Sequence, residues 1–179
     1  MRDVEVFHVY KGGSWGLETL VPIPKSVKST YLSGCESKYI KVSNRMGLKL
    51  FKTKINAQNS FKRQKTAVKI KRGPEVHSAR PARFAIKSPH NGRITTQWGF
   101  FVQHAHNDDE VPRKLEKAFE RQALGLCEDL ENIGISTIDV DISNSGLINN
   151  RLVCLDFGDL SCNMIRENER SYVGRTDKE

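Results

Sequence analysis

The chain lacks long hydrophobic runs, paired cysteines and an apolar leader. No apolar run among its 179 residues approaches the roughly 20 that a membrane-spanning helix needs. The opening residues, MRDVEVFHVYKGG, have no apolar core of the kind that secretory signals carry. The four cysteines form no C-x-x-C pair, and no His/Cys cluster has the spacing of zinc ligands. We therefore expect a soluble cytoplasmic protein with free thiols, no membrane partner and no zinc site.

Acidic residues are missing from one long stretch of the chain. Lys and Arg number 29 against 21 Asp and Glu, for a net charge of +8. Residues 37–74 hold twelve basic residues and no acidic one, whereas residues 107–141 hold ten acidic and four basic residues. A basic half that faces an acidic half suits a polyphosphate-binding cleft or an acidic macromolecular partner. A solvated basic face without a partner would have the same composition.

Hydrophobic periodicity predicts a mixed α+β fold. Two helices are expected over residues 56–70 and 111–133, where Gly73-Pro74 ends the first and Gly134 caps the second. Turns are expected at residues 44–47, 91–92 and 149–150, each of which begins with Asn. Strands are expected over residues 4–10, 38–42, 48–51, 83–86, 96–102 and 151–155.

Oxygen-bearing side chains gather towards the carboxyl end. Asp139 and Asn144 are five positions apart, and Asp156 directly follows the predicted strand over residues 151–155, within the sequence Asp156-Phe157-Gly158. Two carboxylates and an amide on loops that are joined by a short hairpin can converge on one point. Mg²⁺ prefers such oxygen ligands and is usually coordinated by substrate phosphates as well.

This D-x-x-x-x-N and D-F-G pattern resembles the catalytic and metal-binding loops of protein kinases. The resemblance covers about residues 30–162 and implies a protein-kinase-like, two-lobed α+β fold. Residues 1–30 would be an N-terminal extension, residues 31–105 a β-rich small lobe with one helix and a hinge, and residues 106–179 a truncated large lobe with few helices. We would expect such a compact kinase-like chain from a phage, acting in the host cytoplasm.

The resemblance implies a role for each matching residue. Asp139 would be the catalytic residue that accepts the proton of, or orients, the attacking hydroxyl. Asn144 and Asp156 would hold Mg²⁺ against the ATP phosphates. Lys49 would steady the phosphates, because a lysine inside an apolar strand is unusual unless its ammonium reaches an anion. Two simpler interpretations stay open. Lys49 points outward on an edge strand, and Asp139, Asp141 and Asn144 only cap loops in a kinase-like fold that has lost activity.

The nucleotide-binding parts of the pattern are reduced. Gly34 stands alone where protein kinases carry a glycine-rich loop over the phosphates. The main chain at the hinge, at Gln103 and Ala105, would hold the adenine edge. Two nearby histidines, His104 and His106, are expected to face solvent, because no third metal ligand lies close to them in the sequence.

Two positions depart from the kinase pattern. Arg63 or Gln64 stands where the helix of a kinase small lobe carries the glutamate that pairs with the strand lysine. Asp141 stands where protein kinases usually have a lysine near the γ-phosphate, and its negative charge there opposes phosphate binding. Both departures favour a protein that has lost activity.

Three functions fit these observations. The first is an ATP- and Mg²⁺-dependent phosphotransferase that acts on a protein or a small hydroxyl compound. The second is a catalytically inactive, kinase-like binding protein whose basic lobe engages an acidic partner such as a host protein or a nucleic acid. The third is a nucleic-acid-binding module built on residues 37–72, where we find no recognised motif and few aromatic residues.

Overall fold

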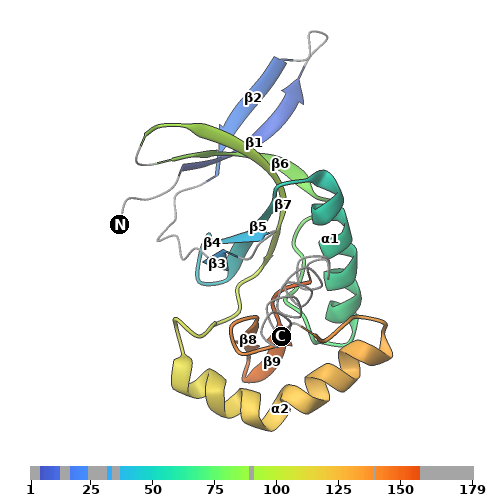
Figure 1. The fold of residues 1–179 in the computed structure, drawn as a ribbon. Helices are drawn as coiled ribbons and strands as arrows, with labels where there is room; N and C mark the ends of the chain where they lie inside the picture. The colour runs from blue at the N-terminus through green and yellow to red at the C-terminus, as the bar shows by residue number, and fades with distance from the viewer. Residues whose placement is uncertain are drawn as a thin grey trace, which may run out of the picture.

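In the residues that it describes, the computed structural model shows a mixed α+β fold with a mostly antiparallel sheet and two helices (Figure 1). The structure describes residues 5–12, 17–23, 32–33, 37–88, 91–138 and 140–157. Within these residues, seven strands join in the order β2-β1-β6-β7-β5-β4-β3, and each neighbouring pair is antiparallel. The strands are β1 (Glu5–Gly12), β2 (Leu17–Pro22), β3 (Leu32–Ser33), β4 (Ser37–Lys41), β5 (Met46–Phe51), β6 (Ala82–Lys87) and β7 (Ile94–Gln103).

The first strands belong to the main sheet. β1 pairs with β6 from Glu5, opposite Lys87, to His8, opposite Phe84, and β2 continues the sheet beyond β1. The periodicity predicts β1 but misses β2. Residues 1–30 were expected to form an N-terminal strand or extension packed on the first lobe. The described part of that range lengthens the same sheet, because β1 supplies backbone partners to β6.

β5 lies inside the sheet, with β4 on one side and β7 on the other. Alternation along a strand places Leu48 and Leu50 on one face and Lys49 and Phe51 on the other. All four side chains are buried, and Lys49 is only 5% exposed. The interpretation that Lys49 points outward on an edge strand is therefore wrong.

Helix α1 (Lys54–Lys69) covers the face of the sheet that carries Lys49 and Phe51. It begins after Thr53, whose hydroxyl oxygen accepts a hydrogen bond from the Asn56 N–H at 3.2 Å and so satisfies a free helical donor. Phe61 packs edge-on against Phe100 of β7, with ring centroids 5.2 Å apart. This apolar contact fixes the helix over β5 and β7.

Helix α2 (Pro112–Asn132) is the longer helix and ends as predicted at a glycine. Gly134 has a φ of 74°, its N–H donates to the Glu131 carbonyl, and the Ile135 N–H donates to the Leu130 carbonyl. Such a left-handed residue and its two bonds satisfy the last carbonyls of a helix. The buried face of α2 contributes Leu115 and Leu126, as well as Leu130, to a hydrophobic cluster.

A hairpin of β8 (Ser145–Ile148) and β9 (Arg151–Cys154) packs on α2 and completes that cluster. Asn149 and Asn150 form its turn with φ values of 51° and 64°, which the mirror-image turn of a tight hairpin requires. Asn tolerates this left-handed region better than most residues, so the predicted turn is confirmed. The chain then reaches Asp156 and Phe157 directly after the hairpin.

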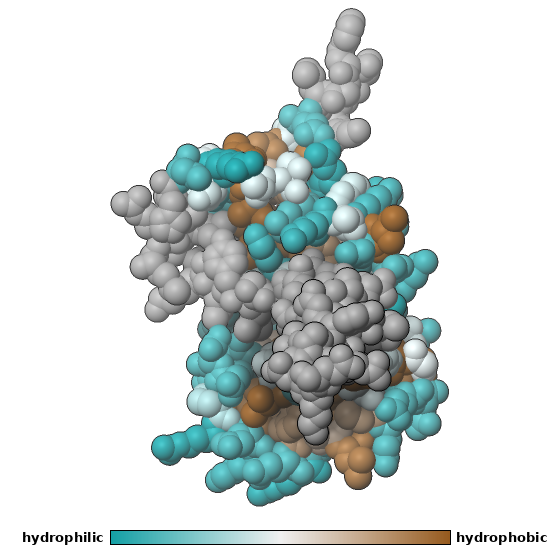
Figure 2. Space-filling view, viewed as in Figure 1, coloured by the Kyte–Doolittle hydropathy of each residue, from teal (hydrophilic) through white to brown (hydrophobic). Residues whose placement is uncertain are grey.

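Hydrophilic residues cover most of the described surface on the face that Figure 2 shows. No helix in the described ranges is both long and apolar enough to cross a membrane.

Candidate functional site

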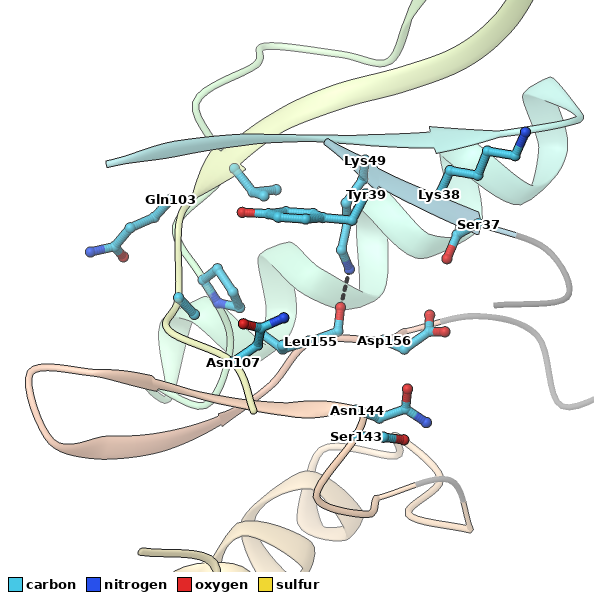
Figure 3. A pocket seen from close by; sticks show the side chains of 13 residues that line it. Ser37, Lys38, Tyr39, Lys49, Gln103, Asn107, Ser143, Asn144, Leu155 and Asp156 are labelled. Carbon is cyan, nitrogen blue, oxygen red and sulfur yellow. Dashed lines mark hydrogen bonds between the residues drawn. The ribbon is translucent and has the colours of Figure 1, made fainter. Parts of the chain in front are cut away.

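A pocket lies where β4 and β5, the exit of β7 and the end of the β8–β9 hairpin meet (Figure 3). The space between its lining residues is about 620 Å³, a figure that includes its opening to solvent. Five residues that were expected from the sequence line it: Lys49, Gln103, Ala105, Asn144 and Asp156. Asp139 and Gly34 lie outside the described residues.

The Lys49 amine reaches the segment that follows β9. It donates a hydrogen bond to the Leu155 carbonyl and lies 5.3 Å from the centre of the Phe157 ring. Burial lowers the pKa of Lys49, and the nearby Asp156 carboxylate raises it in part. The lysine and this carboxylate, which are far apart in sequence, therefore act on each other electrostatically.

The two ends of the pocket differ in chemistry. Figure 3 shows Gln103 at one end, Asp156 and Asn144 at the other, and Lys49 reaching down between them. Asp156 and Asn144 approach from different segments, and the Leu155 N–H donates to the Asn144 carbonyl at 2.8 Å. That bond ties the loop before β8 to the segment after β9, so the carboxylate and the amide are held on one side of the pocket.

Some main-chain groups at the end of β7 have hydrogen-bond partners, and others have none among the described residues. The Gln103 N–H donates to the Glu75 carbonyl at 2.7 Å, and the His104 N–H donates to the Arg45 carbonyl at 2.9 Å. Among the described residues, we find no partner for the N–H or C=O of Ala105, which is only 4% exposed. A buried polar group without a partner is costly, so this main chain is suited to a polar ligand.

Asn107 supplies a further unpaired group in the same pocket. Its side chain is 6% exposed, and its Oδ1 atom has no hydrogen-bond partner among the described residues. Buried side-chain oxygens usually have a partner. The sequence analysis did not select Asn107, because a single asparagine after a strand is an ordinary loop residue.

Asp141 has a local structural role. Its Oδ1 accepts hydrogen bonds from the Ser143 hydroxyl at 2.7 Å and from the Asn144 N–H at 2.8 Å. A carboxylate that binds the backbone a few residues ahead stabilises a turn. The loop-cap interpretation is confirmed for Asp141, which orders the loop that presents Asn144.

Helix α1 offers no carboxylate to Lys49, because none of its sixteen residues is acidic. The Gln64 amide instead donates to the Pro74 carbonyl at 2.9 Å, and the Arg63 guanidinium donates to the Phe157 carbonyl at 3.4 Å. Both residues thus connect the helix to loops around the pocket. The Asp156 carboxylate is the charge that does most to raise the pKa of Lys49 against the effect of burial.

A second polar cluster lies beside the pocket at His104, His106 and Glu110. His104 is only 7% exposed, so the expectation that it faces solvent is wrong, whereas His106 is exposed. Glu110 contacts both imidazoles, which also corrects the expectation that no third ligand lies near them. The spacing His-x-His-x-x-x-Glu could have signalled the cluster, but it depends on a turn that brings Glu110 back.

Comparisons of the chain with protein-family models, curated proteins and solved structures give no match. A case for function must therefore be made from the geometry of the pocket itself. One end of the pocket has main-chain and amide groups that lack a partner among the described residues. The other end has an amine, an amide and a carboxylate. These two ends define what the pocket can bind.

Proposed function

We propose that the chain is a minimal protein-kinase-like phosphotransferase that binds ATP with Mg²⁺ and acts on the hydroxyl of a protein or small molecule. In this proposal the seven-stranded sheet with α1 is the small lobe, and α2 with the β8–β9 hairpin is a reduced large lobe. The observation that carries it is that Lys49, Asn144 and Asp156 line one pocket together with the end of β7.

The residues at the charged end fit a magnesium ion. Asn144 offers an amide oxygen and Asp156 a carboxylate, which are the hard oxygen donors that Mg²⁺ prefers. The ion would supply neutralisation of phosphate charge. Asp156 and Asn144 would bind it, and the turn ordered by Asp141 would keep Asn144 in place.

Lys49 is suited to a phosphate. An ammonium has three N–H donors, and within the described residues one of them is used, on the Leu155 carbonyl. Burial lowers the pKa of Lys49, and a polyphosphate placed beside it would raise that pKa again. The amine would therefore hold its proton most firmly when the anion is bound. The charge of Lys49 would thus depend on whether the pocket is occupied.

The opposite end of the pocket is suited to a nucleobase. The Ala105 N–H and C=O, which have no partner within the described residues, offer one donor and one acceptor, and the Asn107 Oδ1 atom offers a second acceptor. Val102 and the Tyr39 ring add apolar surface to the same pocket. A planar base with adjacent donor and acceptor atoms, such as adenine, would satisfy these groups while its faces stay dry.

A second candidate function is a kinase-like binding protein without turnover. The feature that favours it is α1, which has five basic residues, no acidic residue and hence no carboxylate to pair with Lys49. Such a protein would use its basic surface to engage an acidic partner, and would bind a nucleotide weakly or not at all.

Nucleotide titration and phosphate transfer test the proposal together. We expect saturating ATP with Mg²⁺ to stabilise the chain by about 3 kcal/mol at a hundredfold excess over its dissociation constant. Lys49→Met keeps the length of the side chain but removes the charge, and Asp156→Asn removes the carboxylate. Each should weaken ATP binding at least about tenfold, as expected from the loss of one charged contact of about 1.4 kcal/mol or more.

Glu116→Gln is the matched control, because Glu116 lies on α2, is exposed and does not line the pocket. Label transfer from ATP that is lost in Asp156→Asn and in Asp139→Asn, but kept in the control, supports the phosphotransferase. Weak or absent stabilisation by ATP, together with no label transfer, supports the second candidate. If ATP neither binds nor stabilises the wild-type chain, the proposed function is wrong.

A further inference from the structure

The cluster of His104, His106 and Glu110 has the composition of a metal site. The His104 Nε2 atom lies 2.8 Å from Glu110 Oε2, and the His106 Nδ1 atom lies 3.1 Å from that same oxygen. The three ligand atoms all lie within 4.8 Å of one another. Two imidazoles and one carboxylate are a ligand set that zinc commonly takes at sites with a free fourth position.

The backbone holds the three residues before any ion arrives. His104 is anchored to the turn before β5 through its N–H bond to the Arg45 carbonyl. His106 forms a two-way bridge with Leu147 of β8, with N–O distances of 3.0 and 2.8 Å. The Glu110 N–H donates to the Asn107 carbonyl at 3.1 Å, which folds the turn back on the histidines.

β4 supports the ligands from behind. Tyr39 and Lys41 are two residues apart and lie on the same face of this strand. The Tyr39 hydroxyl lies 2.7 Å from His104 Nδ1, and the Lys41 ammonium donates to the Oε1 atom of Glu110. Metal-binding histidines and carboxylates usually have such outer partners, which orient the ligand atoms towards the ion.

We propose that His104, His106 and Glu110 bind a zinc-class divalent ion, with water in the fourth position. With bonds of about 2.1 Å, the ligand atoms of a tetrahedral zinc site lie about 3.4 Å apart. The present separations of 2.8 and 3.1 Å from Glu110 Oε2 would open by about 0.6 and about 0.3 Å to reach that spacing. Lys41 remains on Oε1, so the ion and the ammonium use different oxygens of Glu110.

Local charge favours the cation. Glu110 supplies a carboxylate to the cluster, and the Lys41 ammonium offsets part of its charge through the Oε1 atom. Two exposed carboxylates, Asp108 and Asp109, precede Glu110 and add negative charge to the same turn.

When the ion binds, the imidazole of His104 can carry its proton on the Nδ1 atom. Its Nε2 atom must face the metal as a lone pair, which puts the proton on Nδ1. The Tyr39 hydroxyl can then accept that N–H, because a phenol hydroxyl can both donate and accept a hydrogen bond. The imidazole changes tautomer without changing charge.

The ion would also act on the neighbouring pocket. Tyr39 lines the pocket, and its hydroxyl contacts the buried metal ligand His104. An occupied site would therefore fix one wall of the pocket and the exit of β7. This site stands on the His and Glu geometry alone, and it does not depend on the pocket binding a nucleotide.

Cobalt and zinc titrations of the untagged, chelator-treated chain test the proposal. We expect one equivalent of Co²⁺ to give the strong visible bands of a tetrahedral ion without the charge-transfer bands of thiolate ligation, and Zn²⁺ to displace it. His106→Ala and Glu110→Gln should each weaken Zn²⁺ binding at least about 100-fold, since each removes a ligand, and Tyr39→Phe about tenfold. His77→Ala is the control, because His77 is exposed and lies outside the cluster.

Each outcome bears on the proposal. His106 is exposed, so its truncation should leave the fold intact, which circular dichroism checks. Zinc binding that is equally strong in His106→Ala and Glu110→Gln would overturn the assignment, as would thiolate bands with Co²⁺. Failure of the wild-type chain to bind either ion would show that the cluster is only a hydrogen-bonded network.

Discussion

Gly47 determines whether the Tyr39 ring can lie across the pocket. A Cβ atom at Gly47 would fall on the Tyr39 hydroxyl and ring carbons, far inside van der Waals contact. The backbone of Gly47 has no positive φ, so the side chain alone opposes a substitution there. Gly47→Ala should therefore displace Tyr39 and break its hydrogen bond to His104.

Two opposing effects decide whether Gly47→Ala stabilises or destabilises the fold. Replacing a strand glycine by alanine normally stabilises by about 0.5–1 kcal/mol, because the unfolded chain loses freedom. Overpacking of a buried site costs about 1–3 kcal/mol, so Gly47→Ala should destabilise the fold by about 1–2 kcal/mol. With Tyr39→Ala already present the obstacle is gone, and the same substitution should become neutral or stabilise by about 0.5–1 kcal/mol.

Urea unfolding of the four chains of this double-mutant cycle measures the effect. Gly125→Ala in α2 is the control, because the nearest atom to its Cβ would be an Arg72 nitrogen at 3.6 Å, an ordinary contact. It should stabilise the chain by about 0.5–1 kcal/mol. If Gly47→Ala stabilises the wild-type chain as much as it does the Tyr39→Ala chain, the described position of Tyr39 is wrong.

Two further substitutions test the caps and charges of the fold. Gly134→Ala should cost about 1–2 kcal/mol, measured by thermal unfolding, because φ is 74° there while the space around its Cβ is open. Glu110 has its pKa lowered from 4.5 to about 2. The folded state therefore binds fewer protons, and the stabilisation is present above pH 4.5 and lost as pH falls towards 2. Glu110→Gln should flatten the dependence of urea stability on pH in that window, and an unchanged slope would contradict the assigned contacts.

Local patterns predicted most of the helices and strands. α2 follows from apolar residues at helical spacing, from Pro112 in its first turn and from Gly134 after its end, and each of these signals lies within or beside the helix itself. The Asn149-Asn150 turn is equally local. β2 was missed, because its place in the sheet depends on pairing with β1, which in turn depends on β6.

The candidate site depends on contacts that form only in the folded chain, so no local sequence pattern could predict them. The sequence selected Lys49 and Asp156 through their motifs, but it left open whether Lys49 faced inward, since that depends on which strands flank β5. Glu110 was missed as a partner of His104 because the turn that joins them is stabilised by the Asn107 carbonyl. Asn107 itself had no signal beyond its burial in the folded chain.

The most direct test of the central claim locates a bound Mn²⁺–ATP complex by paramagnetic broadening of backbone amide signals. The account predicts that the signals of Asn144 and Asp156 broaden first, while those of the exposed Leu124 on α2 stay sharp. Prior saturation with Zn²⁺ should leave this pattern unchanged. Broadening centred on His106 and Glu110, or none near Asp156, would contradict a nucleotide and metal site in this pocket.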